Sequence, residues 1–421
     1  MLRSWVMRAP RCLPPRRISA AVALGLLGAA TWISAPLPAD LTCPDDGVRV
    51  AVRIDCADEA LCRRAETLAL DVWSEHRGPD VPLDIVASPA VIRDLEAEGV
   101  VVEILVPDID AVAQAEAERL RSPTASKPAD WFGEFRDFGA IAARLGDIAA
   151  AHPNRATLVP VGGSIEGRPI LALRIGGTAP DAVPMLVNGA QHAREWIAAM
   201  VTTCVADRLV RGYDTDPAIR EFVDHTELWI IPVVNPDGYQ YSWSTNRYWR
   251  KNRRGSHGVD LNRNFSLAWG GSGSSKDKRS EIYRGEYAFS EPETIALRDL
   301  VRREQVKLHV DFHAYGQLLL YPWNHTPAPA KDRDNFAAVG DRLASAIHAE
   351  HGTSYTLKAG ANLYPAAGTM SDWMYGEAGA LSFTIELRPK GGSGFVLPPD
   401  QIRPTCDEGL AAVLELRKSM R

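Results

Sequence analysis

The sequence lacks a strong charge of either sign. Its 47 Lys and Arg residues and 53 Asp and Glu residues leave a net charge of −6, with a pI near 6.0. This balance argues against nucleic acid or an anionic membrane surface as a partner. Internal repeats and long low-complexity tracts are also missing. The length and the 46% hydrophobic content indicate an ordinary globular chain of two or three domains.

The sequence also lacks an apolar run long enough for a comfortable membrane span. Residues 18–35 are apolar but short, and PLPAD (residues 36–40) has small side chains around a cut after Ala39. Five arginines precede the run: Arg3, Arg8, Arg11, Arg16 and Arg17. We therefore expect a signal peptide over residues 1–39 and a secreted or extracytoplasmic protein. The alternatives are an uncleaved anchor and a twin-arginine signal, which the surrounding residues fit poorly.

Cysteine is scarce and has no zinc-finger spacing. Cys12 should leave with the signal, and export favours an oxidising compartment. The five cysteines that remain are Cys43, Cys56, Cys62, Cys204 and Cys406. An odd number cannot all pair within one chain, so at least one is unpaired or bonded to another chain. Cys204 lies in an apolar helical run, where we expect a buried thiol. The sequence does not determine the pairing.

Alternating strand and helix patterns are abundant. Residues 48–108 form a strand–helix–strand–helix–strand series, whose first helix is predicted over residues 57–76. This series predicts a small α/β domain over residues 45–110. A polar helix and a linker rich in Pro, Ser and Ala follow over residues 111–129, where cleavage is easy. Residues 130–421 alternate again and predict a larger α/β domain with a parallel or mixed sheet.

A histidine and a glutamate lie at one strand-to-helix junction. NGAQHAREW (residues 188–196) follows a buried strand pattern and precedes a helical one. Ligands in open α/β sheets bind beyond the carboxyl ends of strands, so His192 and Glu195 could converge there. An H-x-x-E pair alone is weak evidence, because zinc needs a third ligand. His313, near the end of another strand pattern, supplies a candidate, whereas His309 on the same face is expected to be a core or surface residue rather than a ligand.

Two other stretches place polar groups in apolar surroundings. LSFTIELRP predicts a buried strand that ends in Glu386 and Arg388. A buried carboxylate is costly unless it is paired or functional, and a structural Glu–Arg pair is the alternative. Asn262 and Arg263 follow GVDL and offer a forked set of donors to a carboxylate.

The chain resembles the zinc metallocarboxypeptidases of the pancreatic carboxypeptidase A/B type. The resemblance runs from about Trp131 to the C-terminus, in the family's order and at about its spacing, through QHAREW, NPDGYQYS, NRYWRKNR, DLNRNF, FHAYGQLLLYPW, LYPAAGTMSDWMY and FTIELRPKGGSGFVLPPDQI. The first domain resembles the family's activation propeptide, through LDVW and VVVEILVPDID. The resemblance implies a mixed twisted sheet flanked by helices, a β-α-β-α-β open-sandwich propeptide, and one Zn2+ per catalytic domain.

The resemblance also implies roles for the residues that match the family's reaction centre. His192, Glu195 and His313 match the zinc ligands, which leave the metal's fourth position to water. Glu386 matches the general base that takes a proton from that water and passes it to the leaving amine. Arg250 matches the residue that stabilises the oxyanion.

Further residues match substrate-binding positions of the family. Asn262 and Arg263 match the clamp on the terminal carboxylate of a peptide or protein. Tyr364 matches a mobile tyrosine that closes over the substrate. Arg194 matches a residue that contacts the substrate one subsite upstream, and Phe395 matches an apolar wall.

The side-chain pocket departs from the common family patterns. Ser371 matches the pocket floor, where an acidic residue would select terminal Lys or Arg and a large aliphatic residue would favour apolar termini. Asn324 on the wall is polar but neutral. We predict a preference for neutral apolar or aromatic termini, or broad tolerance, with weak removal of Arg. Asp372 is expected to be structural.

The resemblance makes two structural predictions. Animal members carry a disulfide around DLNRNF, but Ser256 stands at one of those positions, so the loop at residues 270–278 is expected to be mobile. Cis peptide bonds are implied at Arg388–Pro389, where proline lowers the penalty, and at Ala314–Tyr315.

The expected form is a monomeric proenzyme. A trypsin-like protease would cleave within residues 117–130, and no membrane partner is expected after signal removal. A first domain that stays bound as a folding aid is one alternative. Others for the whole chain are a zinc-free peptide-binding protein and an amide hydrolase of cell-wall peptides or N-acyl amino acids. GGSIEG and GGSGF are not nucleophile elbows, so a serine hydrolase is disfavoured.

Overall fold

The computed structural model describes residues 47–55, 59–74, 82–122, 130–392 and 394–420. The expected signal peptide, Cys43, Cys56 and residues 123–129 of the expected cleavage segment fall outside these ranges. Among the described residues, no helix combines the length and apolar content needed to span a bilayer.

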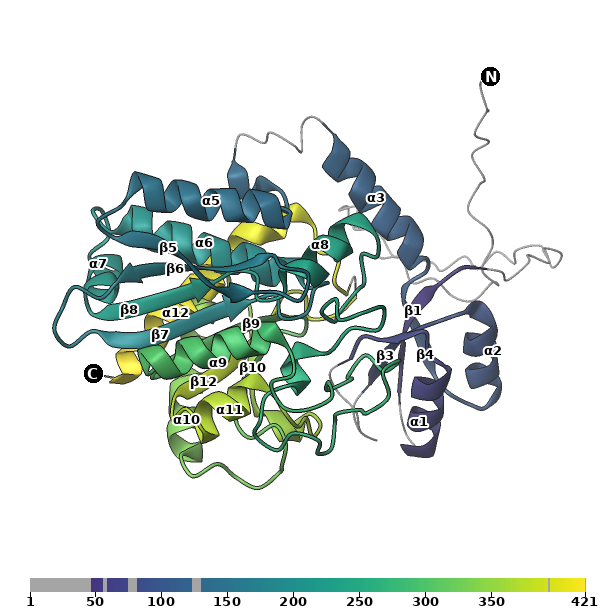
Figure 1. Ribbon diagram of the computed structural model, residues 1–421. Coiled ribbons are helices and arrows are strands. Elements are labelled where there is room, and N and C mark those ends of the chain that lie inside the picture. The colour runs from purple at the N-terminus through teal and green to yellow at the C-terminus, as the bar shows by residue number, and fades with distance from the viewer. Residues whose placement is uncertain (1–46, 56–58, 75–81, 123–129, 393, 421) are drawn as a thin grey trace, which may run out of the picture.

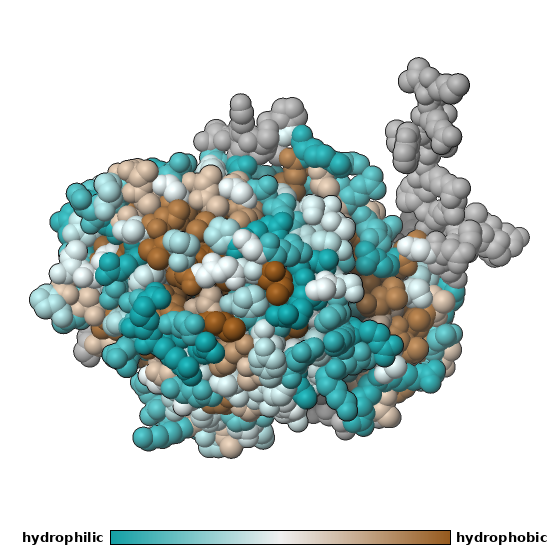
Figure 2. Space-filling model, viewed as in Figure 1, coloured by the Kyte–Doolittle hydropathy of each residue, from teal (hydrophilic) through white to brown (hydrophobic). Residues whose placement is uncertain are grey.

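The N-terminal unit is an antiparallel sheet covered by two helices. The sheet has the order β2-β3-β1-β4, and α1 and α2 enclose a separate small core with it. Figure 2 shows hydrophobic residues gathered over this unit. Its elements are β1 (Val50–Ile54), α1 (Glu59–Leu68), β2 (Asp71–Val72), β3 (Leu83–Ala87), α2 (Pro89–Ala97) and β4 (Val102–Val106), and α3 (Ile109–Arg121) follows.

The helix predicted over residues 57–76 is wrong at its C-terminal end. α1 stops at Leu68, and Asp71 and Val72 pair with β3 instead. The Trp73 N–H donates to the Asp84 carbonyl (2.8 Å), which extends this edge pairing. Asp, Val and Trp are not strong helix formers, so tertiary contacts of this segment decide its conformation.

The larger unit is built on an eight-stranded mixed sheet of order β11-β10-β12-β9-β7-β8-β6-β5. The four central strands β12, β9, β7 and β8 are parallel. Its elements are η1 (Trp131–Gly133), α5 (Phe138–Ala151), β5 (Ala156–Gly163), β6 (Pro169–Gly176), β7 (Val183–Gly189), α6 (Trp196–Gly212), α7 (Pro217–Asp224), β8 (Thr226–Ile231), α8 (Pro236–Ser244), η2 (Leu261–Arg263), α9 (Pro292–Glu304), β9 (Leu308–Ala314), β10 (Leu318–Tyr321), α10 (Arg333–His351), β11 (Thr356–Ala359), η3 (Gly360–Asn362), α11 (Met370–Gly376), β12 (Leu381–Leu387), η4 (Pro399–Gln401), α12 (Ile402–Arg417) and η5 (Lys418–Met420).

Helices cover both faces of this sheet, as Figure 1 shows. The larger core joins one face to α5, α6, α7, α10 and α12. A smaller core joins the other face to α9 and α11. The strands therefore have two buried faces, which explains their nearly continuous apolar sequences. The expected twisted mixed sheet with flanking helices is confirmed.

A disulfide joins α6 to α12 within the larger core. Cys204 and Cys406 are bonded, although they are 202 residues apart in the sequence. The free buried thiol expected at Cys204 is therefore wrong, because an apolar helical pattern cannot reveal which thiol lies opposite. Cys62 in the N-terminal unit is also disulfide-bonded. Disulfides agree with the oxidising compartment that the sequence favours.

Candidate metal centre and active site

The candidate site lies where three parallel strands end. β7 leads into the turn that carries His192 and Glu195, while β9 carries His313 and β12 carries Glu386. His313 and Glu386 are direct partners in the β9–β12 register. Asn235 fixes the turn after β7, since its Nδ2 donates to the Gln191 carbonyl (3.0 Å). Residues far apart in the sequence thus meet at one edge of the sheet, as expected for parallel strands.

Three donors converge at this edge and are almost completely buried. The Nδ1 atom of His192 lies 2.8 Å from Glu195 Oε1 and 3.1 Å from the Nδ1 atom of His313. The Glu195 Oε2 atom lies 3.0 Å from the same His313 nitrogen. Two imidazole nitrogens and a carboxylate aimed at one point suit a metal ion. Nitrogen and carboxylate donors of this kind are typical of zinc.

The charges around these donors keep the carboxylates ionised. Burial raises the pKa of Glu195, but His192 and His313 outweigh it and bring that pKa to about 2. Burial also raises the pKa of Asp260, but Arg250, Arg263 and His192 hold it far below its usual value. An ionised Glu195 is the form that can bind a metal.

A carboxylate lies behind each of the two histidines. The Nε2 atom of His192 lies 3.2 Å from Asp260 Oδ1, and the Nε2 atom of His313 lies 3.0 Å from Asp311 Oδ2. Sequence reasoning missed both acids. Asp260 lies within the GVDL stretch, and Asp311 lies between His309 and His313 on the same strand face, so alternation was the available signal.

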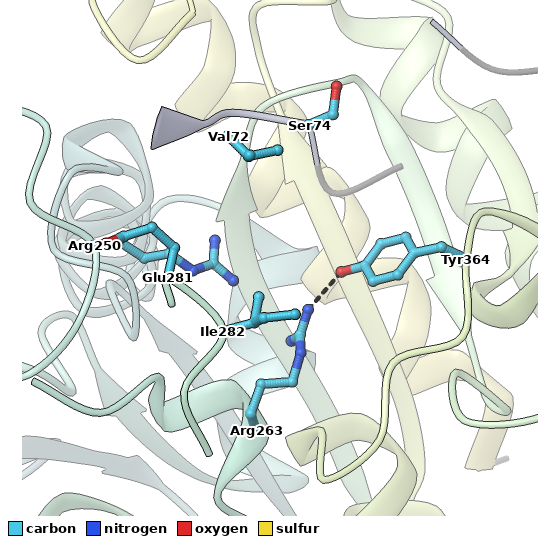
Figure 3. A pocket seen from close by; sticks show the side chains of 7 residues that line it. All are labelled: Val72, Ser74, Arg250, Arg263, Glu281, Ile282 and Tyr364. Carbon is cyan, nitrogen blue, oxygen red and sulfur yellow. Dashed lines mark hydrogen bonds between the residues drawn. The ribbon is translucent and has the colours of Figure 1, made fainter. Parts of the chain in front are cut away.

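Two of the three arginines expected to act on substrate, Arg250 and Arg263, border one pocket. Figure 3 shows Arg250, Arg263 and Tyr364 around it, with Val72 and Ser74 of the N-terminal unit on one side. The Nη2 atom of Arg250 donates to Asp260 (3.0 Å). The Nη2 atom of Arg263 donates to the Tyr364 hydroxyl (2.7 Å).

A second pocket adjoins the first and contains the predicted side-chain site. Asn262, Arg263, Ser371 and Glu386 line it together. The Asn324 Nδ2 atom, on the pocket wall, donates to the Ser371 hydroxyl (2.9 Å). The remaining lining includes the apolar Leu320, Leu363 and Ala366.

Asp372 is bonded in the way expected of a structural residue. It accepts hydrogen bonds from the backbone N–H groups of Asn324 (2.8 Å) and His325 (3.0 Å). The Asn324 side chain donates to it as well (2.9 Å). Asp372 therefore holds the pocket wall in place.

The N-terminal unit occupies the side of the site where the upstream part of a substrate is expected to lie. Arg194, expected to contact substrate, donates instead to the Asp71 carboxylate (2.8 Å) and to the Val72 carbonyl (3.2 Å). Phe395 lies under the Arg194 guanidinium, 4.2 Å from ring centroid to Cζ, and packs edge-on against Trp73. The two residues thus lie together, but the N-terminal unit covers them.

Several secondary expectations can be compared directly with the structure. The Arg388–Pro389 and Ala314–Tyr315 bonds are both cis, as predicted, and Pro322–Trp323 is a further cis bond that the sequence did not suggest. His309, expected to be a core or surface residue rather than a ligand, is buried and bonded within the core. Arg388, the arginine of the alternative structural pair with Glu386, donates to Glu408 and Gln401.

The loop at residues 270–278 is better anchored than the sequence suggested. Arg263 Nε donates to the Gly273 carbonyl (2.8 Å), and Arg284 Nη1 donates to the Gly270 carbonyl (3.0 Å). Gly273 has a φ of +72°, and a Cβ there would lie 1.7 Å from the Pro365 carbonyl oxygen. Polar contacts and a required glycine thus hold the loop where animal relatives are expected to have a disulfide.

Comparison with known proteins adds independent evidence. The sequence model of the zinc carboxypeptidase family matches residues 141–412. Carboxypeptidase A1 of Rattus norvegicus is 32% identical over 389 residues, which cover 87% of this chain and 92% of the rat protein. Carboxypeptidase B of Bos taurus is 32% identical over 386 residues, which cover 88% and 91%. The crystal structure of carboxypeptidase A from Helicoverpa armigera matches with a TM-score of 0.79 at 27% identity, covering 88% of this chain and 97% of that one.

Proposed function

The chain belongs to the zinc carboxypeptidase family and is a metallocarboxypeptidase with one catalytic zinc, and from that premise we propose that it is secreted as an inactive proenzyme. Once processed, it removes C-terminal residues from peptides. The proposed boundaries are residues 1–39 for the signal, 45–110 for the propeptide, 111–129 for the cleavable connector and 130–421 for the catalytic domain. The observation that carries the proposal is the convergence of the three metal donors, Glu386 and Arg263 at one edge of the sheet.

We assign the metal to His192, Glu195 and His313, and proton transfer to Glu386. Zinc, when bound, supplies a Lewis acid that polarises the scissile carbonyl and makes water a better nucleophile. Glu386 takes a proton from the attacking water and passes it to the leaving amine. Its placement beside His313 in the strand register supports this role.

The arginines select the end of a chain. Asn262 and Arg263 hold the terminal carboxylate, and Arg250, oriented by Asp260, stabilises the developing oxyanion. Arg263 is almost fully buried. An internal peptide bond would leave its charge desolvated and without a carboxylate, which costs several kcal/mol. Specificity for the terminus therefore comes from rejection as well as attraction.

The proposed substrates end in a neutral residue, apolar or aromatic, with broad tolerance as the alternative. Apolar Leu320 and Leu363 on the wall support this preference, as does the absence of a charged group at Ser371 on the floor. Without an acidic partner at that position, a terminal Arg would lose its hydration with no compensation. We therefore expect Arg to be removed slowly.

The N-terminal unit covers the upstream side of the site, which supports the proposal that it keeps the proenzyme inactive. Asp71 and Val72 engage Arg194, which a substrate would otherwise contact. Cleavage by a trypsin-like protease within residues 117–130 would separate this unit from the catalytic domain. Arg119 and Arg121, at the end of α3, are candidate cleavage positions.

Peptide hydrolysis by full-length protein would test the proposal. Peptides that differ only in their last residue are incubated with the protein before and after light trypsin treatment, with and without a zinc chelator. We expect release of C-terminal residues only after trypsin, only without chelator and only from a free carboxylate. Glu386→Gln should lower kcat by several orders of magnitude, whereas Glu350→Gln on the exposed face of α10 should not change it. Equal activity of Glu386→Gln and wild type would contradict the assigned base.

A further inference from the structure

β9 carries a line of polar side chains through the middle of the sheet. His309, Asp311 and His313 alternate along one face of the strand, and all three are buried. Burying a carboxylate at such a position costs several kcal/mol unless it is bonded or compensated by charge. The surroundings of Asp311 show how this cost is met.

Two amide side chains hold the Asp311 carboxylate. Asn188 Nδ2 donates to its Oδ1 atom (2.6 Å), and Gln191 Nε2 donates to its Oδ2 atom (2.5 Å). Asn188 is the register partner of Asp311 on β7, and Gln191 lies in the turn that carries His192. Asp311 is thus tied both to the neighbouring strand and to the turn that holds another metal donor.

The hydrogen bonds continue away from the metal centre through His309 and Ser382. The orientation of Asn188 determines which atom donates in each of them. Because Asn188 donates through its nitrogen, its Oδ1 atom accepts from His309 Nε2 (2.8 Å). His309 Nδ1 then accepts from the Ser382 hydroxyl (2.7 Å). This requires a neutral His309, and burial lowers the pKa of His309 to about 4. The chain of bonds therefore presents only donors to Asp311 from this side.

A further neighbour of Asp311 is a candidate metal donor. Asp311 Oδ2 lies 3.0 Å from His313 Nε2, at ion-pair distance though not aligned for a full hydrogen bond. In a neutral imidazole, which is the form that binds a metal, a carboxylate there favours the proton on Nε2 rather than on Nδ1. Nδ1 is the His313 atom that faces His192 and Glu195.

We propose that Asp311, held by Asn188 and Gln191, is a positioning residue that fixes His313 with Nδ1 toward the zinc and strengthens zinc binding. The inference rests on the zinc ligands assigned under the proposed function. Asp260 stands behind His192 in the same way, so each metal histidine has its own carboxylate. Such partners orient the ring and increase its basicity as a ligand.

A charge swap separates the position of the carboxylate from its mere presence. In Asp311→Asn an amide of nearly the same shape replaces the carboxylate, so the negative charge beside His313 is lost. The double variant Asn188→Asp/Asp311→Asn keeps one acid and one amide in the same pair and moves the charge away from His313. Thr203→Val serves as the control, because it removes a buried hydroxyl of α6 that bonds only to the Ala199 carbonyl among the contacts described.

The readouts are the zinc dissociation constant, by competition with a chromophoric chelator, and the melting temperature after zinc removal. We expect both acid variants to bind zinc about 10 to 100 times more weakly than wild type, and Thr203→Val to bind it normally. The Co2+-substituted double variant should also show an altered visible spectrum. The double variant should melt close to wild type, so weaker binding cannot be assigned to unfolding.

Wild-type zinc affinity in the folded double variant would overturn the inference, even if Asp311→Asn alone fails to fold. His313→Ala distinguishes this result from failure of the proposed function. If His313→Ala loses zinc while the double variant keeps it, the ligand assignment stands and only the role of Asp311 is wrong. If His313→Ala also keeps zinc at wild-type affinity, both are wrong.

Discussion

At the scale of single residues, the floor of the proposed side-chain pocket depends on three positions together. Asn324 donates to Ser371, and a Cβ at Gly360 would lie 1.8 Å from the Asn324 Oδ1 atom. Asn324 therefore requires a glycine at position 360. The result is a polar but neutral floor within a largely apolar wall.

Ser371→Asp should redirect the proposed peptidase toward basic termini. A carboxylate on the buried floor would be stabilised by a terminal Lys or Arg and left unpaired by Phe or Leu. We expect the ratio of kcat/KM for terminal Arg over terminal Phe to rise at least tenfold, about 1.4 kcal/mol. Trypsin-processed variant and wild type are compared on peptides that differ in the last residue. Ser371→Ala is the control, and an unchanged ratio in Ser371→Asp would show that Ser371 does not face the substrate side chain.

The residues that the sequence could reveal are those with unusual chemistry at a strand end. His192, Glu195 and His313 were found in this way, and the structure brings them together. Asp260 and Asp311 were missed because an acid within a strand or turn usually lies on a solvated face. Their burial depends on partners such as Arg250 and Asn188, and no local pattern of sequence encodes those pairings.

At the scale of elements, α9 begins with an acid that is buried rather than solvated. Glu293 lies in the first turn, where the helix dipole favours a negative charge. Ile165 N–H (3.0 Å) and Asn252 Nδ2 (3.2 Å) donate to it. Burial nevertheless dominates and raises the pKa of Glu293 to about 7.

This raised pKa predicts how Glu293→Gln changes stability with pH. Folded wild type retains the Glu293 proton between about pH 4.5 and 7, where the unfolded chain loses it, so Glu293 lowers stability progressively as pH rises through this window. Glu293→Gln should match wild type near pH 4 and be more stable at pH 8, by up to roughly 3 kcal/mol. Chemical denaturation at several pH values measures the difference. Asp299→Asn, on the exposed face of the same helix, should show no comparable pH-dependent gain, and a constant difference for Glu293→Gln would contradict the assignment.

Periodicity predicted the elements of this fold better than their ends. The strands of the central sheet and the small N-terminal unit both follow from their apolar patterns. The end of α1 did not, because β2 exists through pairing with β3 and through the contacts of Asp71 and Val72 with Arg194. Local propensity carries no information about such partners.

At the scale of the whole molecule, the two units are joined by charged and aromatic contacts. Glu116 of α3 binds Arg247, and the Asp84 carboxylate of β3 accepts from the Tyr315 hydroxyl (2.8 Å). Trp73 stacks on Tyr248, with ring centroids 5.2 Å apart. These pairs join residues more than 100 positions apart, so the sequence could suggest a covering unit only through family resemblance.

Asp71→Asn should make the proposed proenzyme active before cleavage. Asp71 is the carboxylate that binds the buried Arg194 guanidinium, and breaking a buried ion pair by removing one partner costs about 3–5 kcal/mol. That cost falls only on the covered form, because a separated catalytic domain has no contact with Asp71. We therefore expect uncleaved Asp71→Asn to hydrolyse peptides at least tenfold faster than uncleaved wild type.

Initial rates measured with a serine-protease inhibitor present would exclude accidental processing, and electrophoresis would confirm an intact chain. After trypsin treatment the variant and wild type should have equal kcat and KM, because their catalytic domains are identical. Asp94→Asn, exposed on α2 of the same unit, should leave the uncleaved protein inactive. If uncleaved Asp71→Asn is as inactive as wild type, the ion pair does not maintain inhibition. The aromatic contacts of Trp73 would then hold the N-terminal unit over the site in the absence of the ion pair.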